Sequence, residues 1–159
     1  MANIIDLSTA GITLQYAVEA TAGTRPTTGY TIIHGLKSTP SLNPAPETLE
    51  TTTFDATVYK TYIDGLKDLG GALEFTFNLT QNLLDTWDEL MTEYEEAKTS
   101  GKAVWFTIVI PGLTESVYFT GNPSNMGLPE TSVSSVLETT NYITATNEPN
   151  FFAKPTAGE

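Results

Sequence analysis

The stretch Ala72–Gly101, "ALEFTFNLTQNLLDTWDELMTEYEEAKTSG", joins two different hydrophobic periods. In its first part, "LEFTFNL", apolar and polar residues alternate, which is the pattern of a half-buried β-strand. From Thr80 onward the apolar residues recur at helical spacing, and Gly101 then follows as a helix stop. The stretch therefore predicts a core strand over 72–79 and an amphipathic helix over 81–99.

The expected helix has an apolar side and an acidic side. We expect Thr80 to cap its N-terminus, because a threonine side chain can accept from the first free backbone N–H groups. The side chains expected at the helix-to-sheet contact are Leu83, Trp87, Leu90, Met91, Tyr94, Phe75 and Phe77. We expect the acidic side to be a solvated stripe, without a pocket to raise the pKa of any member; it comprises Asp85, Asp88, Glu89, Glu93, Glu95 and Glu96.

The rest of the chain is predicted to be mainly β. Strands are expected over 12–19, Tyr30–Lys37, Glu47–Phe54, Ala103–Ile110, Glu115–Gly121 and Thr131–Thr146. Two extended loops are expected, Thr21–Gly29 with two glycines and a proline and Ser38–Pro46 with three prolines. The tail Pro149–Glu159 is expected to be an arm or a frayed end. Because no repeat or internal boundary is present, the predicted fold class is one domain over residues 1–159, mainly β with one flanking α-helix (α+β), which covers a β-sandwich or barrel.

Composition excludes several classes of function. The 159 residues include 19 acidic and 7 basic side chains, which gives a formal net charge of −12. Because such a surface repels nucleic acid phosphates, the charge argues against a DNA- or RNA-binding module. There is no cysteine, so disulfides and thiolate metal sites are excluded. The N-terminus lacks the pattern of a secretory signal, and no window approaches the roughly 20 apolar residues of a membrane span. We expect a chain that is made and folded in a cytoplasm.

No motif predicts catalysis or a cofactor. "GLKDLGG", Gly65–Gly71, lacks the Gly-Lys-Ser/Thr ending of a phosphate loop, and we expect its glycines to form a turn with positive φ. His34, the single histidine, lies in an expected strand without a partner for nucleophilic catalysis. The spacing of Asp55, Asp64 and Asp68 matches no calcium loop. We therefore predict no catalytic residue, cofactor or metal site, and a protein that is not an enzyme.

One expected strand has little to bury within its own chain. Glu47–Phe54, "ETLETTTF", favours extended backbone through its threonines, but neither of its faces is apolar. Polar strands of this kind are weakly specified within a monomer, and their open edges invite pairing with other chains. We expect this strand to pair with other copies of the chain.

Several fragments resemble one family in their order and spacing. They are "GITLQYAVEA", "PETLETTTFDATVYKTYIDGLKDLGGALEFTFNLTQ", the acidic helix with Trp87, and "AVWFTIVIPG" followed by "VYFTGNPSNMG". Over residues 11 to about 146 this pattern resembles the major tail tube protein of long-tailed, non-contractile bacteriophages. The resemblance implies a β-sandwich with a flanking helix that assembles into sixfold rings, which stack into a hollow tube with a continuous inner β-barrel.

The resemblance also implies partners and a location. Double-stranded DNA would pass through the lumen during ejection without specific binding. The partners would be other copies of the chain and the tape measure, tail terminator and tail-tip proteins, with no membrane. The protein would belong to the virion tail, after assembly in the host cytoplasm.

Carried onto this chain, the resemblance implies roles for particular residues. Strands for the inner barrel would be 31–37 and 47–54, with 131–146 as a further candidate. The lumen candidates are Glu47, Glu50, Thr52 and Lys37, and the candidates for ring-to-ring contact are Arg25, Pro26, Leu42, Pro44, Phe151 and Phe152.

Two other functions remain open at this stage. The tube protein of a contractile injection or secretion system uses a similar fold. A monomeric β-sandwich binding module, for example for carbohydrate, would be expected to present aromatic side chains on an exposed face. We expect both tryptophans, Trp87 and Trp105, to lie in the core, which favours the tube subunit.

Overall fold

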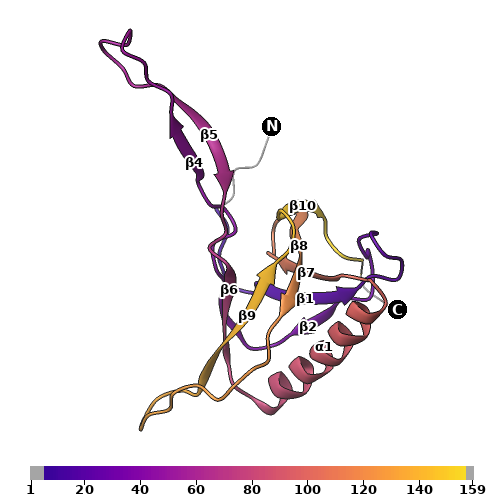
Figure 1. Cartoon of the computed structure of the whole chain (residues 1–159). Helices are drawn as coiled ribbons and strands as arrows, with labels where there is room; N and C mark the ends of the chain where they lie inside the picture. Colours follow the sequence, from indigo (N-terminus) through magenta and orange to yellow (C-terminus); the bar gives the residue numbers. More distant parts are fainter. Residues whose placement is uncertain (1–5, 157–159) are drawn as a thin grey trace.

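A computed structural model describes residues 6–156, which fold into a mainly β structure with one helix (Figure 1). In chain order the elements are β1 (Thr13–Val18), β2 (Thr31–Ile33), β3 (Leu36–Ser38), β4 (Pro46–Glu50), β5 (Tyr62–Lys67), β6 (Ala72–Asn78), α1 (Gln81–Thr99), β7 (Val104–Val109), β8 (Glu115–Pro123), β9 (Glu138–Ala145) and β10 (Asn150–Ala153). No helix in this described part is long and apolar enough to cross a membrane.

Eight strands form one antiparallel sheet, and β4 and β5 form a separate hairpin. The sheet order is β2-β1-β7-β8-β9-β6-β3, and β10 pairs with the first half of β8. The β2–β1–β7 end of the sheet lies across the β9–β6–β3 end, so that the sheet curls into a half-barrel (Figure 1). The expectation of a mainly β fold with one flanking helix is confirmed in this form, with a single curled sheet.

The strand and helix of 72–99 form as expected. Leu73, Phe75 and Phe77 of β6 are buried, and the residues between them face the other way. The helix α1 begins after Thr80, whose Oγ1 accepts a hydrogen bond from the backbone N–H of Leu83 at 3.2 Å. The alternation of apolar residues in β6, the helical spacing of those in α1 and the Thr80 cap therefore specify this part of the fold from local sequence.

The apolar side of α1 closes the core. Leu83, Trp87 and Leu90 are all at most 1% exposed, and Met91 and Tyr94 pack beside them at its border. The Trp87 ring meets Phe77 of β6 edge-on at 6.3 Å between ring centroids. Its Nε1 donates to the backbone oxygen of Ser124 at 2.9 Å, so the one polar atom of this buried ring is satisfied.

The expected strand Tyr30–Lys37 is wrong as a single strand. The structure divides it into β2, which pairs with β1, and β3, which pairs with β6. The break is the turn at His34 and Gly35, where Gly35 has φ +91°, a conformation that favours glycine. A Cβ at Gly35 would also lie 3.3 Å from the Asn78 backbone oxygen. His34 therefore lies exposed in a turn, not in a strand.

Other expected boundaries also change. The strand expected over Thr131–Thr146 is confined to β9, and residues 124–137 form a loop before it. The described part of the tail is not frayed, because residues 150–153 form β10 along β8. Trp105 is half-buried instead of lying in the core, and its Nε1 donates to Oε1 of the buried Glu19 at 3.1 Å.

Gly121 allows β8 to change partners midway. Before this residue β8 pairs with β7, and from Gly121 to Pro123 it pairs with β9. A Cβ at Gly121 would come within 2.6 Å of Ile143 Cγ2, so a side chain here would push the two strands apart. The curl of the sheet therefore depends on close approach at one glycine.

The helix-to-sheet contact predicts a difference between two leucines of α1. Leu90→Ala is expected to lower the free energy of unfolding by about 2–5 kcal/mol, because it removes a fully buried side chain and leaves a cavity. Leu84→Ala is the matched control, since Leu84 is 38% exposed on the same helix, and it is expected to cost less than about 1 kcal/mol. Urea unfolding followed by circular dichroism measures both; equal losses would contradict the packing described.

Candidate functional site

The β4–β5 hairpin projects from the half-barrel and carries an eleven-residue loop, 51–61, at its far end (Figure 1). Leu49 lies opposite Ile63, and Glu50 lies opposite Tyr62. The ladder continues beyond the strands, since the backbone N–H of Thr51 donates to the Thr61 oxygen at 2.8 Å. The hairpin backbone is thus ordered by its own hydrogen bonds, although all but one of its strand residues are exposed.

Large apolar side chains of the hairpin face solvent. The exposed set is Leu49, Phe54, Val58, Tyr59, Tyr62, Ile63 and Leu66. Phe54 is fully exposed, and Val58 and Tyr59 at the tip are 80% and 83% exposed. An isolated two-stranded hairpin is at best marginally stable in water, and an apolar patch of this kind marks an interaction site. The hairpin is therefore the main candidate for a functional surface.

The hairpin differs from the strand expected in this part of the sequence. The expected strand Glu47–Phe54 is too long, since β4 covers Pro46–Glu50, and one of its edges pairs with β5 of the same chain and not with another copy. Its second strand β5 was missed, because Gly65 and Asp64 interrupt the apolar alternation there. Of the glycines expected in a turn, Gly70 and Gly71 have positive φ, but Gly65 lies within β5. The remaining sequence signal for a hairpin here is the Thr-rich loop that follows β4.

The structure does not bring the four lumen candidates together. Glu47 and Glu50 lie on β4, and Thr52 follows in the loop at the end of the hairpin. Lys37 lies on β3 and forms an ion pair with Glu138 of β9. The strands 31–37 and 47–54 also do not pair with each other in this chain. Their place in an inner barrel stays a prediction.

The outer face of β3, β6 and β9 is a continuous polar surface. Glu74 lies opposite Tyr142 and Thr76 opposite Thr140, on the side away from the buried phenylalanines of β6. Its members are Lys37, Ser38, Ala72, Glu74, Thr76, Asn78, Glu138, Thr140 and Tyr142. Thr144, opposite Ala72 near the end of β9, borders a groove instead. The charged side chains are one lysine and two glutamates, so this face has a formal charge of only −1, from +1 and −2.

Two ring-contact candidates pack inside the chain. The guanidinium of Arg25 lies 4.5 Å from the ring centroids of both Tyr118 of β8 and Phe152 of β10. The Tyr118 hydroxyl also donates to the backbone oxygen of Ala153 at 2.7 Å. These contacts, which we call the Arg25 clamp, join β10 and the loop 21–29 to β8. Pro26 follows Arg25 directly in this loop. Whether these residues also contact another ring is a separate question that stays a prediction.

Three of the other ring-contact candidates, Leu42, Pro44 and Phe151, line a groove at the foot of the hairpin. The groove has a volume of about 930 Å³ and lies between the loop before β4, the end of β5 and the β9–β10 connection. Its apolar wall is formed by Leu42, Pro44, Leu66, Leu69, Ala145 and Phe151, and we call it the basal groove. Leu66 and Phe151 are 85% and 59% exposed, so the wall is open to a partner.

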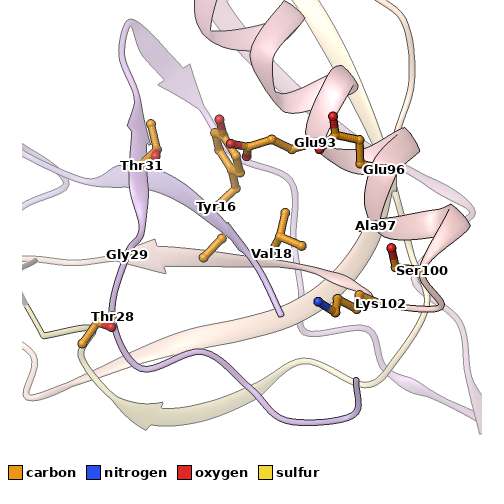
Figure 2. Close-up of a pocket in the computed structure, with 11 residues that line it drawn as sticks. Tyr16, Val18, Thr28, Gly29, Thr31, Glu93, Glu96, Ala97, Ser100 and Lys102 are labelled. Carbon is orange, nitrogen blue, oxygen red and sulfur yellow. The ribbon is translucent and has the colours of Figure 1, made fainter. Parts of the chain in front are cut away.

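A second, smaller pocket of about 410 Å³ lies between α1 and the β1–β2 region (Figure 2). Tyr16 of β1 and Glu93 of α1 point toward one another in it. Burial raises the pKa of Glu93 most, followed by the neighbouring charge of Glu89; a hydrogen bond with the Tyr16 hydroxyl opposes them, and the charge of Glu96 raises the pKa least. The expectation that no member of the acidic stripe has a raised pKa is therefore wrong for Glu93. The other five acids of the stripe are exposed.

Among the described residues, neither cavity groups the side chains that would hold a metal ion. In residues 6–156 no three His, Asp or Glu side chains are grouped closely enough to hold a metal ion. The groove walls combine apolar side chains with exposed polar rims, which suits contact with another polypeptide. What the arrangement offers is exposed apolar surface.

The fold is similar to one found in a phage-related particle. No protein-family model and no curated protein matches the chain. Among solved structures, the chain is similar to one from the "Cryo-EM structure of the anti-feeding prophage (AFP) baseplate, 6-fold symmetrised", with a TM-score of 0.59 and 10% sequence identity. The match covers 96% of this chain and 97% of that chain, so the likeness includes the whole fold.

The raised pKa of Glu93 predicts a pH-dependent stability. A carboxyl whose pKa is higher in the folded state binds its proton more tightly there, so folding gains stability as the pH falls through the folded pKa toward 4.5. Glu93→Gln removes this dependence and is expected to raise the melting temperature at pH 7, with a difference that shrinks toward pH 4.5. Glu95→Gln, the same change on the exposed side of α1, is the control. If both variants shift equally at every pH, the effect comes from net charge alone.

Proposed function

We propose that this chain is a structural subunit of a phage-tail-like particle, and that it assembles into sixfold rings that stack into a hollow tube. The observation that carries the proposal is the projecting hairpin, whose apolar side chains are exposed in the single chain. The fold likeness to a chain of a sixfold baseplate structure supports it. In this proposal the hairpin is buried between copies, which supplies the cover that two strands need to be stable.

The polar face of β3, β6 and β9 is the lumen wall in this proposal. A sheet that is buried on one face by α1 and the core, and polar on the other, suits a water-filled barrel. The formal charge of −1 on this face is small beside the −12 of the whole chain. At physiological salt the Debye length is about 8 Å, so such a wall would repel only DNA that comes close. Double-stranded DNA would then pass without sticking.

The tube can belong to a non-contractile tail or to a contractile injection system. The sequence pattern favours the first, and the anti-feeding prophage likeness is a likeness of fold. We propose the non-contractile tail tube, because its motif order spans most of the chain. The tape measure, tail terminator and tail-tip proteins would then be its further partners.

The two tryptophans do not favour a carbohydrate-binding module. Trp87 is 1% exposed, and Trp105 is half-buried with its Nε1 directed to Glu19. Neither tryptophan can serve as a flat stacking platform. Most of the exposed aromatic side chains lie instead on the hairpin or on β10.

The first test removes the apolar hairpin tip. The double variant Phe54→Ser/Tyr59→Ser is expected to keep the melting temperature of the monomer, because both side chains are exposed, and to lose rings and tubes. The control is Asp55→Ser/Lys60→Ser, which changes polar residues of the same loop. Negative-stain electron microscopy and light scattering of concentrated protein give the result. A wild-type chain that forms no ring or tube, alone or on a tail-tip template, would refute the proposal.

A second test concerns the lumen wall. In assembled tubes Glu74→Lys is expected to increase retention of double-stranded DNA, and the increase should fall as salt rises, because each neutralised phosphate releases counterions. Glu95→Lys makes the same charge change on the outer side of α1 and should not retain DNA in the bore. Equal retention by both variants, measured by co-sedimentation of tubes with DNA, would place Glu74 outside the lumen.

A further inference from the structure

We infer that the hairpin tip of one copy docks in the basal groove of a second copy. The tip is the group Phe54, Val58 and Tyr59 in the loop 51–61. The inference rests on the proposed function, because it names the two surfaces through which copies would meet. It commits to one occupant of the groove, the same chain.

The two surfaces match in chemistry. The tip presents two aromatic side chains and a valine, each at least 80% exposed. The groove presents Leu66 and Phe151, also largely exposed, above a floor of less exposed apolar residues. Bringing these surfaces together removes apolar area from water on both sides, which drives association. The basal groove is also the larger of the two cavities described above.

A chain cannot fill its own groove with its own tip. The groove lies at the foot of the hairpin, beside Lys67–Leu69, and the tip lies at the opposite end (Figure 1). Residues 60–64 lie between the tip residue Tyr59 and Gly65, the first residue of β5 that lines the groove. In extended conformation the six steps from Tyr59 to Gly65 span about 20 Å, at roughly 3.3 Å per residue. The contact therefore joins different copies. Because each copy offers one tip and one groove, the contact repeats from copy to copy, which generates closed rings or open filaments.

Charge also favours this pair of surfaces. Copies that carry −12 each repel one another, so they must meet where local charge is low. The tip loop carries Asp55 and Lys60, which sum to zero, and the groove rim carries Lys67, Asp68 and Glu148, which sum to −1. The outer side of α1, with five exposed acids, is a poor place for two copies to meet.

The loop 124–137 is the competing receptor. It projects at the other end of the β8–β9 pair (Figure 1), and Leu128, Val133 and Val136 are strongly exposed there. None of its residues lines the basal groove or the pocket beside α1. The tip would bury less apolar area against a projecting loop than inside a groove, so the loop 124–137 serves as the comparison in the test.

Cysteine cross-linking tests the inference directly, because the natural chain contains no cysteine. Val58→Cys marks the tip, Thr144→Cys marks the groove and Val136→Cys marks the competing loop; all three positions are exposed. The Val58→Cys chain carries a short tag, so that mixed dimers run between the two homodimers on a non-reducing gel. Each mixture is oxidised under the conditions in which wild-type protein assembles, and electron microscopy is run on the same samples.

We expect a mixed dimer from Val58→Cys with Thr144→Cys and little from Val58→Cys with Val136→Cys. A single chain that carries both Val58→Cys and Thr144→Cys should give a ladder beyond the dimer, since each copy then links to two others. Rings or tubes with a mixed dimer only at Val136→Cys, or with none, would overturn the docking and leave the proposed assembly standing. Absence of rings and tubes in every sample, with or without a tail-tip template, would overturn both.

Discussion

The burial of one side of α1 in the curled sheet is the interaction on which the rest of the structure depends. Trp87 fills the space beside Phe77 and binds the Ser124 backbone, so it ties the helix both to β6 and to the segment after β8. With this face of the sheet occupied, the opposite face of β6 and β9 is left polar and open. One helix thus decides which side of the sheet is core and which side can become a surface.

The hairpin is the part of the chain that this core does not stabilise. Its order comes from local hydrogen bonds, such as the Thr51–Thr61 pair, whose Oγ1 atoms are 3.0 Å apart. Its apolar side chains cost free energy as long as they face water. The clamp of Arg25 between Tyr118 and Phe152 shows the opposite solution, because there the tail finds its partners within the chain. The tail is thus packed within the chain, whereas the apolar side chains of the hairpin stay exposed.

The elements that could be predicted from the sequence are those set by local patterns. The helix Gln81–Thr99 agrees with its cap and period at both ends. The pairing of β2 with β1 and of β3 with β6 could not be predicted, because the apolar residues of 30–37 continue across the turn at Gly35. The raised pKa of Glu93 also needs tertiary information, since the helix pattern alone places it on the acidic side, whereas β1 brings Tyr16 next to it.

The sequence predicts the polar strand β4 but not the hairpin and the exposed apolar surface to which it belongs. The polar residues around Glu50 indicate that β4 buries little within its own chain. This inference depends only on the residues of β4 itself. The location of the apolar surface depends on which strand pairs with β4. That strand is β5, and Gly65 interrupts its alternation of apolar and polar residues, so the sequence pattern does not predict it. Gly65 is there because its absent side chain makes room, as a Cβ would lie 3.1 Å from Glu47 Cβ. Close backbone approach in the hairpin thus removed the signal that would have revealed it.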